Sequence, residues 1–164
     1  MRSISVCVLA AALATPAFAD DGPTASLSVA ASQRLGPVPE ELSFERVDTA
    51  IGKTWWHRLH LGVDAAVGTG GNASSFEQVM LDAGLWLHAS ERIDVLSAWR
   101  VGYAHFSIFD MPVGAKVIEA VPAEFRVRIR DSLDVRFAPV VATNYFAGVW
   151  SLFAGPELGL VWRL

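Results

Sequence analysis

The chain has 164 residues, a length that suits one domain and leaves little room for a second. Its hydrophobic content of 52% and mean hydropathy of +0.37 are high for a secreted soluble domain, yet after the first stretch no apolar run approaches the roughly 20 residues of a membrane helix. Thirteen basic residues stand against seventeen acidic ones without a basic patch, so we expect no nucleic-acid partner.

The beginning of the sequence has the pattern of a secretory signal peptide. Arg2 supplies the basic start, residues 4–14 are apolar, and Ala17-Phe18-Ala19 forms a small-x-small cleavage site. The alternative, a membrane helix over residues 4–14, is too short to span a bilayer. We expect a signal peptide over residues 1–19 and one domain over residues 20–164. The one cysteine of the sequence, Cys7, lies in this signal, so the exported domain would have no disulfide and no thiolate metal ligand.

Apolar and polar residues alternate with period two along most of the remaining sequence, as in half-buried β-strands. In chain order the predicted strands cover residues 25–35, 41–51, 55–68, 76–88, 93–109, 121–130, 133–143 and 148–164. Tight turns are expected at 52–53, 90–91 and 131–132, and longer connections at 36–40, 69–75, 110–114 and 142–147. Pro122, Pro139 and Pro156 each remove a hydrogen-bond donor, so we expect bulges or strand ends there.

Each clear strand has one apolar face and one polar face. In residues 55–68, for example, Leu61 and Val63 alternate with His60 and Asp64. The polar faces carry mixed charges among small residues: Arg58, His60, Asp64, Asp82, Asp94, Arg100, Glu124, Arg126, Arg128, Arg136, Glu157 and Arg163. Such a face suits a narrow barrel interior filled by ion pairs, with the apolar face against lipid. A soluble lipocalin-like barrel of the periplasm is the alternative, because it shows the same period with the apolar face turned inward.

Three features favour the membrane barrel. The last strand alternates up to Leu164 and resembles the terminal assembly signal of outer-membrane proteins. Aromatic residues fall near predicted strand ends, as an interfacial girdle requires: Trp55, Trp56, Trp86, Tyr145 and Trp150. A closed barrel also pairs every backbone polar group, which lipid demands.

The sequence therefore predicts an all-β fold, a single eight-stranded antiparallel up-and-down transmembrane β-barrel in the outer membrane of a Gram-negative bacterium. A barrel of about eight strands has an interior only wide enough for side chains, so we expect a structural or lipid-interacting role and not a pore. The expected partners are outer-membrane lipid, lipopolysaccharide and the barrel assembly machinery. No cofactor and no metal site is expected.

One hairpin carries a candidate active site. Counting the alternation from Trp99 places His105 and Ser107 on the lipid-facing side, where polar residues are least expected. If the hairpin is symmetric about Pro112, Glu119 lies directly opposite His105 and the three side chains cluster. An imidazole can take the proton of a serine hydroxyl while a carboxylate orients the imidazole. His105, Ser107 and Glu119 are thus a candidate base, nucleophile and orienting acid.

The spacing of His105, Ser107 and the downstream Glu119 resembles that of the lipid A 3-O-deacylases, small outer-membrane barrels that cleave an acyl ester of lipopolysaccharide. The resemblance covers residues 105–119, and the pair Trp55-Trp56 entering a strand adds to it. It implies a lipid A ester hydrolase with its site on the barrel wall, as the enzymatic alternative to a structural role. The other interpretation places these polar residues at the level of the lipid headgroups, where they are tolerated.

Overall fold

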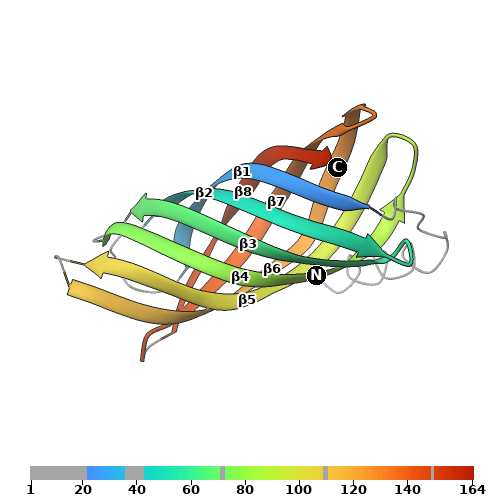
Figure 1. The fold of residues 1–164 in the computed structure, drawn as a ribbon. Helices are drawn as coiled ribbons and strands as arrows, with labels where there is room; N and C mark the ends of the chain where they lie inside the picture. Colours follow the sequence, from blue (N-terminus) through green and yellow to red (C-terminus); the bar gives the residue numbers. More distant parts are fainter. Residues whose placement is uncertain (1–21, 36–42, 71–72, 109–110, 149) are drawn as a thin grey trace, which may run out of the picture.

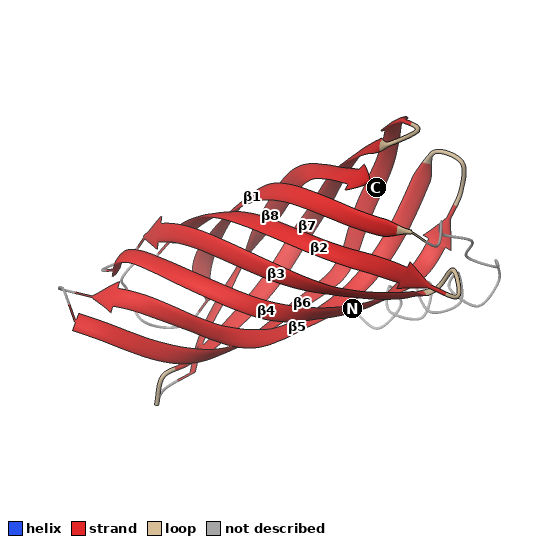
Figure 2. Ribbon diagram, viewed as in Figure 1, coloured by secondary structure: helices blue, strands red, loops and turns tan. Residues whose placement is uncertain are grey.

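The computed structural model describes residues 22–35, 43–70, 73–108, 111–148 and 150–164, and the predicted signal peptide lies outside them. The described residues form eight β-strands (Figure 2). None of them belongs to a helix long and apolar enough to cross a membrane. The strands are β1 (Pro23–Leu35), β2 (Ser43–Trp55), β3 (Leu59–Gly70), β4 (Ala73–Ala89), β5 (Ile93–Ile108), β6 (Met111–Arg130), β7 (Leu133–Phe146) and β8 (Trp150–Arg163).

The strands close into one antiparallel barrel in which each strand pairs with its neighbours in the sequence (Figure 1). Closure is made by β1 and β8, with Thr24 opposite Arg163 near one end and Leu35 opposite Leu152 near the other. We call the end with the β2–β3, β4–β5 and β6–β7 connections the turn end, and the opposite end the loop end. The predicted eight-stranded antiparallel barrel is confirmed.

Five strands, β1, β2, β4, β6 and β7, are longer than the sequence pattern predicted. The prediction of a turn at 52–53 is wrong. Gly52 remains in the ladder opposite Gly62, and the chain turns at 56–58. A Cβ atom at Gly52 would lie 2.6 Å from the His60 ring, so this glycine makes room for an interior side chain. The connections expected at 69–75, 110–114 and 142–147 are also too long, since β3 ends at Gly70, β6 begins at Met111 and β7 ends at Phe146.

A bulge at Pro122 changes which residues of β6 face the interior. Glu124 lies opposite Leu96 of β5 and Val121 opposite Ala98, so two residues, Pro122 and Ala123, face one residue of β5. The bulge predicted at Pro122 is therefore confirmed. It shifts the alternation by one residue, so that the apolar Val121 and the charged Glu124 are both buried inside.

The other two prolines share a second irregularity. The register between β7 and β8 shifts between Ala138 and Val141, opposite Glu157 and Gly155, and the shifted segments contain Pro139 and Pro156. The bulge expected at these prolines is confirmed as well.

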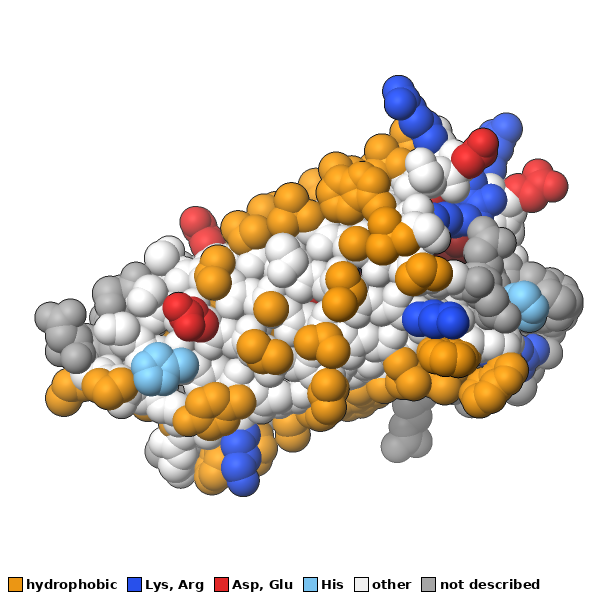
Figure 3. Space-filling view, viewed as in Figure 1, with side chains coloured by type: hydrophobic (Ala, Val, Ile, Leu, Met, Phe, Trp, Pro, Cys, Tyr) orange, Lys and Arg blue, Asp and Glu red, His pale blue; other side chains and the backbone are white. Residues whose placement is uncertain are grey.

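Apolar side chains gather on the outer wall of the barrel, as the face drawn in Figure 3 shows. The interior is polar and charged over much of its length. The exposed large apolar side chains of the wall include Val29, Val47, Ile51, Val63, Val79, Leu81, Leu85, Trp99, Val101, Val127, Phe137 and Leu158. The lipocalin-like alternative required these faces inside, and the structure places them outside. The prediction that Trp86 and Tyr145 belong to the interfacial girdle is wrong, because both side chains are buried in the interior.

Candidate functional site

The barrel interior holds a layer of buried charges, which we call the ion-pair layer. Its members come from β2, β4, β5, β6, β7 and β8: Arg46, Asp48, Asp82, Arg100, Glu119, Glu124, Arg126, Arg136 and Glu157. Burying a charge is costly unless an opposite charge and hydrogen bonds compensate it. The stability of each buried charge in this layer therefore depends on its ion-pair and hydrogen-bond partners.

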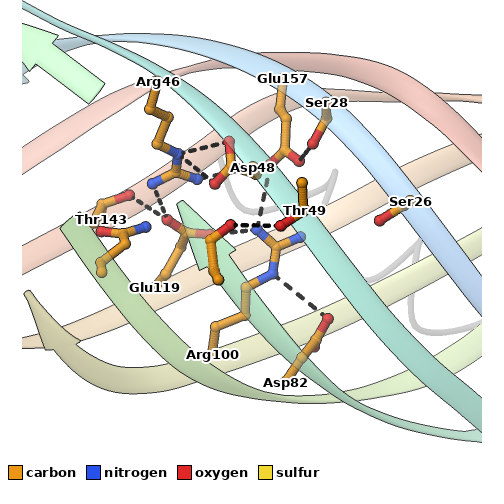
Figure 4. Close-up of polar contacts among 12 residues, drawn as sticks. Ser26, Ser28, Arg46, Asp48, Thr49, Asp82, Arg100, Glu119, Thr143 and Glu157 are labelled. Carbon is orange, nitrogen blue, oxygen red and sulfur yellow. Dashed lines mark hydrogen bonds and ion pairs between the residues drawn. The ribbon is translucent and has the colours of Figure 1, made fainter. Parts of the chain in front are cut away.

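Glu119 lies at the centre of the best-paired part of the layer (Figure 4). Its Oε2 atom accepts a hydrogen bond from Nη1 of Arg46 at 2.6 Å and from the Thr143 hydroxyl at 2.7 Å. Its Oε1 atom accepts from Nη1 of Arg100 at 2.6 Å. Both arginines are themselves buried, and Arg46 also contacts Asp48 at 2.9 Å. One carboxylate thus joins β2, β5, β6 and β7 across the interior.

Two further glutamates extend the layer toward the turn end. Glu157 accepts hydrogen bonds from the Ser28 hydroxyl at 2.6 Å, from Arg136 and from Nη1 of Arg100 at 3.3 Å. Glu124 pairs with Arg126 at 2.6 Å and with Arg136 at 3.0 Å. Acids and arginines alternate, so most charges in the layer have an opposite neighbour.

Asp64 is the exception among the buried acids. Its side chain is 0% exposed, and no donor within the described part of the chain forms a hydrogen bond with either carboxylate oxygen. An uncompensated buried carboxylate costs free energy. Asp64 is therefore placed to weaken the barrel, whereas Glu119 is placed to stabilise it.

A cluster of aromatic side chains fills the interior near the loop end. The aromatic cluster consists of Phe44, Phe76, Phe106, Tyr145 and Phe153, with Met80, Ala104, Ala115 and Val117 packed among them. Several ring pairs meet edge to face, with centroids 4.7 Å apart for Phe44 and Phe153 and 5.1 Å apart for Phe106 and Tyr145. The Tyr145 hydroxyl donates to Gln78 at 3.1 Å. The aromatic cluster and the ion-pair layer together obstruct the interior along its axis.

A cavity of about 320 Å³ with charged residues in its lining opens at the turn end. Arg163 lines this mouth and pairs with Asp134 at 2.9 Å and with Asp94 at 3.4 Å. In the described ranges, no group of His, Cys, Asp and Glu side chains has an arrangement that could hold a metal ion. The cavity is thus a mouth lined with ion pairs.

Most of the charges predicted for the interior are there. His60, Asp64, Asp82, Asp94, Arg100, Glu124, Arg126, Arg136 and Glu157 are buried, and Arg128 and Arg163 are half-buried. Arg58 is the error, since β2 continues to Trp55 and leaves Arg58 exposed in the turn. Sequence reasoning did not place Arg46, Asp48, Glu119 and Asp134 in the interior, where the structure buries them.

The outer wall changes character near the loop end. There polar side chains face outward beside apolar ones, among them Glu45 on β2, Glu77 on β4, His105 on β5 and Lys116 on β6. The inward neighbours on β2, β4 and β5 belong to the aromatic cluster. On β2, β4 and β5 the two faces therefore exchange polarity toward the loop end, so one rule of apolar outside and polar inside does not hold along the whole of these strands.

The structure separates the three predicted catalytic residues. His105 and Ser107 are on the outward side of β5, as expected, but His105 lies opposite Gly114 and Glu119 lies opposite Arg100. The prediction that Glu119 faces His105 on the outer wall is wrong. The hairpin connection is shorter than assumed, with Ile108 opposite Met111, and this moves the register so that Glu119 pairs elsewhere and points inward.

A different carboxylate stands beside His105. Glu77 of β4 is its direct cross-strand partner, and Ser75 is the partner of Ser107. The side chains of both Glu77 and His105 are exposed on the outward face. Directly opposite residues on one face of an antiparallel pair have Cβ atoms about 4.5–5.5 Å apart. A serine, a histidine and a glutamate thus lie on one patch of the outer wall, with Glu77 in the place we expected for Glu119.

The fold is similar to those of small bacterial outer-membrane barrels. The neisserial surface protein NspA aligns with a TM-score of 0.65 at 8% identity, over 87% of this chain and 97% of that chain. The N-terminal barrel domain of OprF from Pseudomonas aeruginosa gives 0.52 at 11% identity, covering 88% of this chain and 100% of that chain. Ail, the attachment invasion locus protein of Yersinia pestis, gives 0.52 at 13% identity with the same coverage.

No protein-family model and no curated protein sequence matches the chain. At these identities the structural likeness shows the fold and leaves the role of the chain to be argued from its own residues. The resemblance to lipid A 3-O-deacylases stays an expectation from the sequence.

Proposed function

We propose that the chain is a small outer-membrane barrel of structural, lipid-interacting role that conducts no solute. One observation carries the proposal: the apolar side chains face outward and the charges face inward, the reverse of a soluble barrel. Such a wall suits lipid because the sheet is closed, so each strand finds hydrogen-bonding partners on both sides and no sheet edge is left open. Outer-membrane lipid and lipopolysaccharide are the partners that this wall fits.

The filled interior supports the second part of the proposal. The aromatic cluster closes the loop-end half, and the ion-pair layer crosses the barrel below it. An eight-stranded barrel has room for side chains and little else. Solute passage would require both layers to separate, at the cost of leaving buried charges without partners.

Reconstitution into planar lipid bilayers tests this role. The refolded barrel should insert and show no conductance above that of the bare bilayer, because both layers obstruct the axis. A variant with Phe44, Phe106 and Phe153 replaced by alanine serves as the comparison, since it removes much of the aromatic cluster. Stable single-channel conductance from the unaltered chain would contradict the proposal.

The patch formed by Glu77, His105 and Ser107 supports a second candidate, ester hydrolysis on a membrane lipid. A carboxylate beside the imidazole and a serine on the same outward face are the groups that nucleophilic acyl transfer requires. Lipid A is the substrate that the sequence resemblance suggests, and the site would meet it from the lipid side.

Mass spectrometry of lipid A from cells that express the chain distinguishes the two roles. If the second candidate is right, one ester-linked acyl chain is lost, and Ser107→Ala or Glu77→Gln restores the full pattern. Glu119→Gln, at the residue that the sequence had suggested, should act only through stability. An unchanged lipid A profile beside correctly folded protein leaves the structural role alone.

A further inference from the structure

The β2–β3 turn is built in a conformation that its residues disfavour. Trp56 and His57 have φ angles of 52° and 58°, in the left-handed region, and the turn is closed by a hydrogen bond from Arg58 N to Trp55 O at 3.1 Å. Two central residues with positive φ fit a type I′ hairpin turn, for which Asn-Gly is preferred. Bulky aromatic residues in this region are strained. Strain retained at a defined place is a reason to look for a function there.

The turn presents an aromatic and cationic surface. Trp56 is 77% exposed, the highest value among the exposed large hydrophobic residues, and Trp55 beside it is 43% exposed. The Lys53 ammonium lies 4.3 Å from the centre of the Trp55 ring. Arg58 is exposed at the last position of the turn, and its carbonyl accepts a hydrogen bond from Trp86 N of β4 at 2.9 Å, which fixes the turn to the barrel.

This surface continues the apolar outer wall. Ile51 of β2 and Leu61 of β3 are exposed on the same side, toward the middle of the barrel. Figure 3 shows a basic side chain with apolar side chains around it at the turn-end edge of this wall. Tryptophan rings favour the boundary between lipid and water, and lysine and arginine near an anionic leaflet are attracted to its charge.

Within the described ranges, neither Lys53 nor Arg58 forms an ion pair with a carboxylate. Among the described residues, the exposed acids of this end are Glu91 and Asp131, and they belong to the other two turns. The two cations are therefore left for a partner from outside the barrel. An anionic group at the depth of the tryptophan rings, in a lipid that also contacts the apolar wall, satisfies both features at once.

From this geometry we propose that Lys53, Trp55, Trp56 and Arg58 form a binding site for the phosphate of anionic phospholipid headgroups at the turn end. The site rests on the proposed membrane role and adds a lipid preference to it. The strained turn projects Trp56 into the interface, with Lys53 beside the Trp55 ring and Arg58 exposed at the last position of the turn. A phosphate bound there contacts both cations.

The test compares urea unfolding of the refolded chain in phosphatidylcholine vesicles and in phosphatidylcholine vesicles mixed with phosphatidylglycerol. The unaltered chain should have the higher urea midpoint in the anionic vesicles. Lys53→Gln with Arg58→Gln should lose more than half of that difference. The matched control is Arg92→Gln with Arg130→Gln, which removes the same charge from exposed arginines at the same end. This control should keep most of the difference in urea midpoint between the two kinds of vesicle.

A second variant distinguishes the contact of the Trp56 ring with the lipid interface from the backbone strain at this residue. Asparagine tolerates the left-handed region far better than tryptophan, so a purely local effect predicts that Trp56→Asn raises the midpoint. The proposal predicts the opposite sign in anionic vesicles, because the ring that fixes the turn at the interface is lost. A rise in the midpoint, or an equal loss of lipid dependence in the Arg92 and Arg130 control, would overturn the site. A chain that inserts in both vesicles without any lipid difference would overturn the site alone, whereas failure to insert in either would overturn the membrane role itself.

Discussion

Glu119→Gln lowers the free energy of unfolding by about 3–5 kcal/mol, the range expected when one partner of a buried ion pair is removed. Glutamine keeps the shape of the side chain and removes the charge that compensates both Arg46 and Arg100, each 2.6 Å away. The two guanidinium groups then stay buried with weaker partners. Urea titration of the barrel in lipid vesicles measures the change.

Asp64→Asn is the matched control for this prediction. Asp64 is as buried as Glu119, but no described donor reaches its oxygens, so removing its charge should leave stability unchanged or raise it. Opposite signs at the two positions support the account of the interior. Equal losses would show that burial of an acid, and not its pairing, determines the effect.

Leu81→Arg is expected to destabilise the barrel in lipid by about 2–4 kcal/mol, the cost of a cation on the lipid face near the bilayer midplane. Leu81 is 63% exposed and lies between Val63 of β3 and Val101 of β5, both exposed apolar residues. The comparison is with Glu77→Arg on the same face of the same strand, closer to the loop end. There the wall is already polar, and about 0–1 kcal/mol is expected.

Unfolding midpoints of both variants in the same vesicles check this prediction. A large effect at Leu81 and a small one at Glu77 would locate the edge of the apolar wall between the two positions. If both substitutions cost the same, the outer face has no depth dependence and the wall does not face a bilayer.

The strand count and the charged interior could be predicted from the sequence because alternation is a local signal. His60 and Asp64, for example, are two residues of one strand on one face, and their orientation needs no knowledge of other strands. The prolines were informative for the same reason, as each marks a place where the ladder loses a donor.

The partner of His105 could not be predicted because register depends on the length of the connection. A hairpin symmetric about Pro112 places Glu119 opposite His105, and the shorter connection found in the structure replaces it by Gly114. The same step places Glu119 inside. Glu77, which does lie opposite His105, is on the preceding strand, and only the β4–β5 register reveals it.

Arg46 and Asp48 were missed for a different physical reason. The loop-end part of β2 has the apolar Phe44 inside and the charged Glu45 outside. In the middle of β2 the large apolar side chains face outward and the charged ones inward. A single rule that places apolar residues outside and polar residues inside along the whole strand therefore does not identify the inward face of β2. The i, i+2 spacing of Arg46 and Asp48, two opposite charges on one face, was the available indication.

The contact of the outer wall with acyl chains can be measured directly along β4. The sequence contains one cysteine, Cys7 in the predicted signal peptide, so single cysteines introduced at residues 78–85 of the refolded domain can each carry a nitroxide. In lipid vesicles, we predict that collisions with oxygen, which dissolves in lipid, are frequent at 79, 81, 83 and 85 and rare at 78, 80, 82 and 84. Frequent collisions of the odd positions with a water-soluble nickel complex, or oxygen access without period two, would contradict the account.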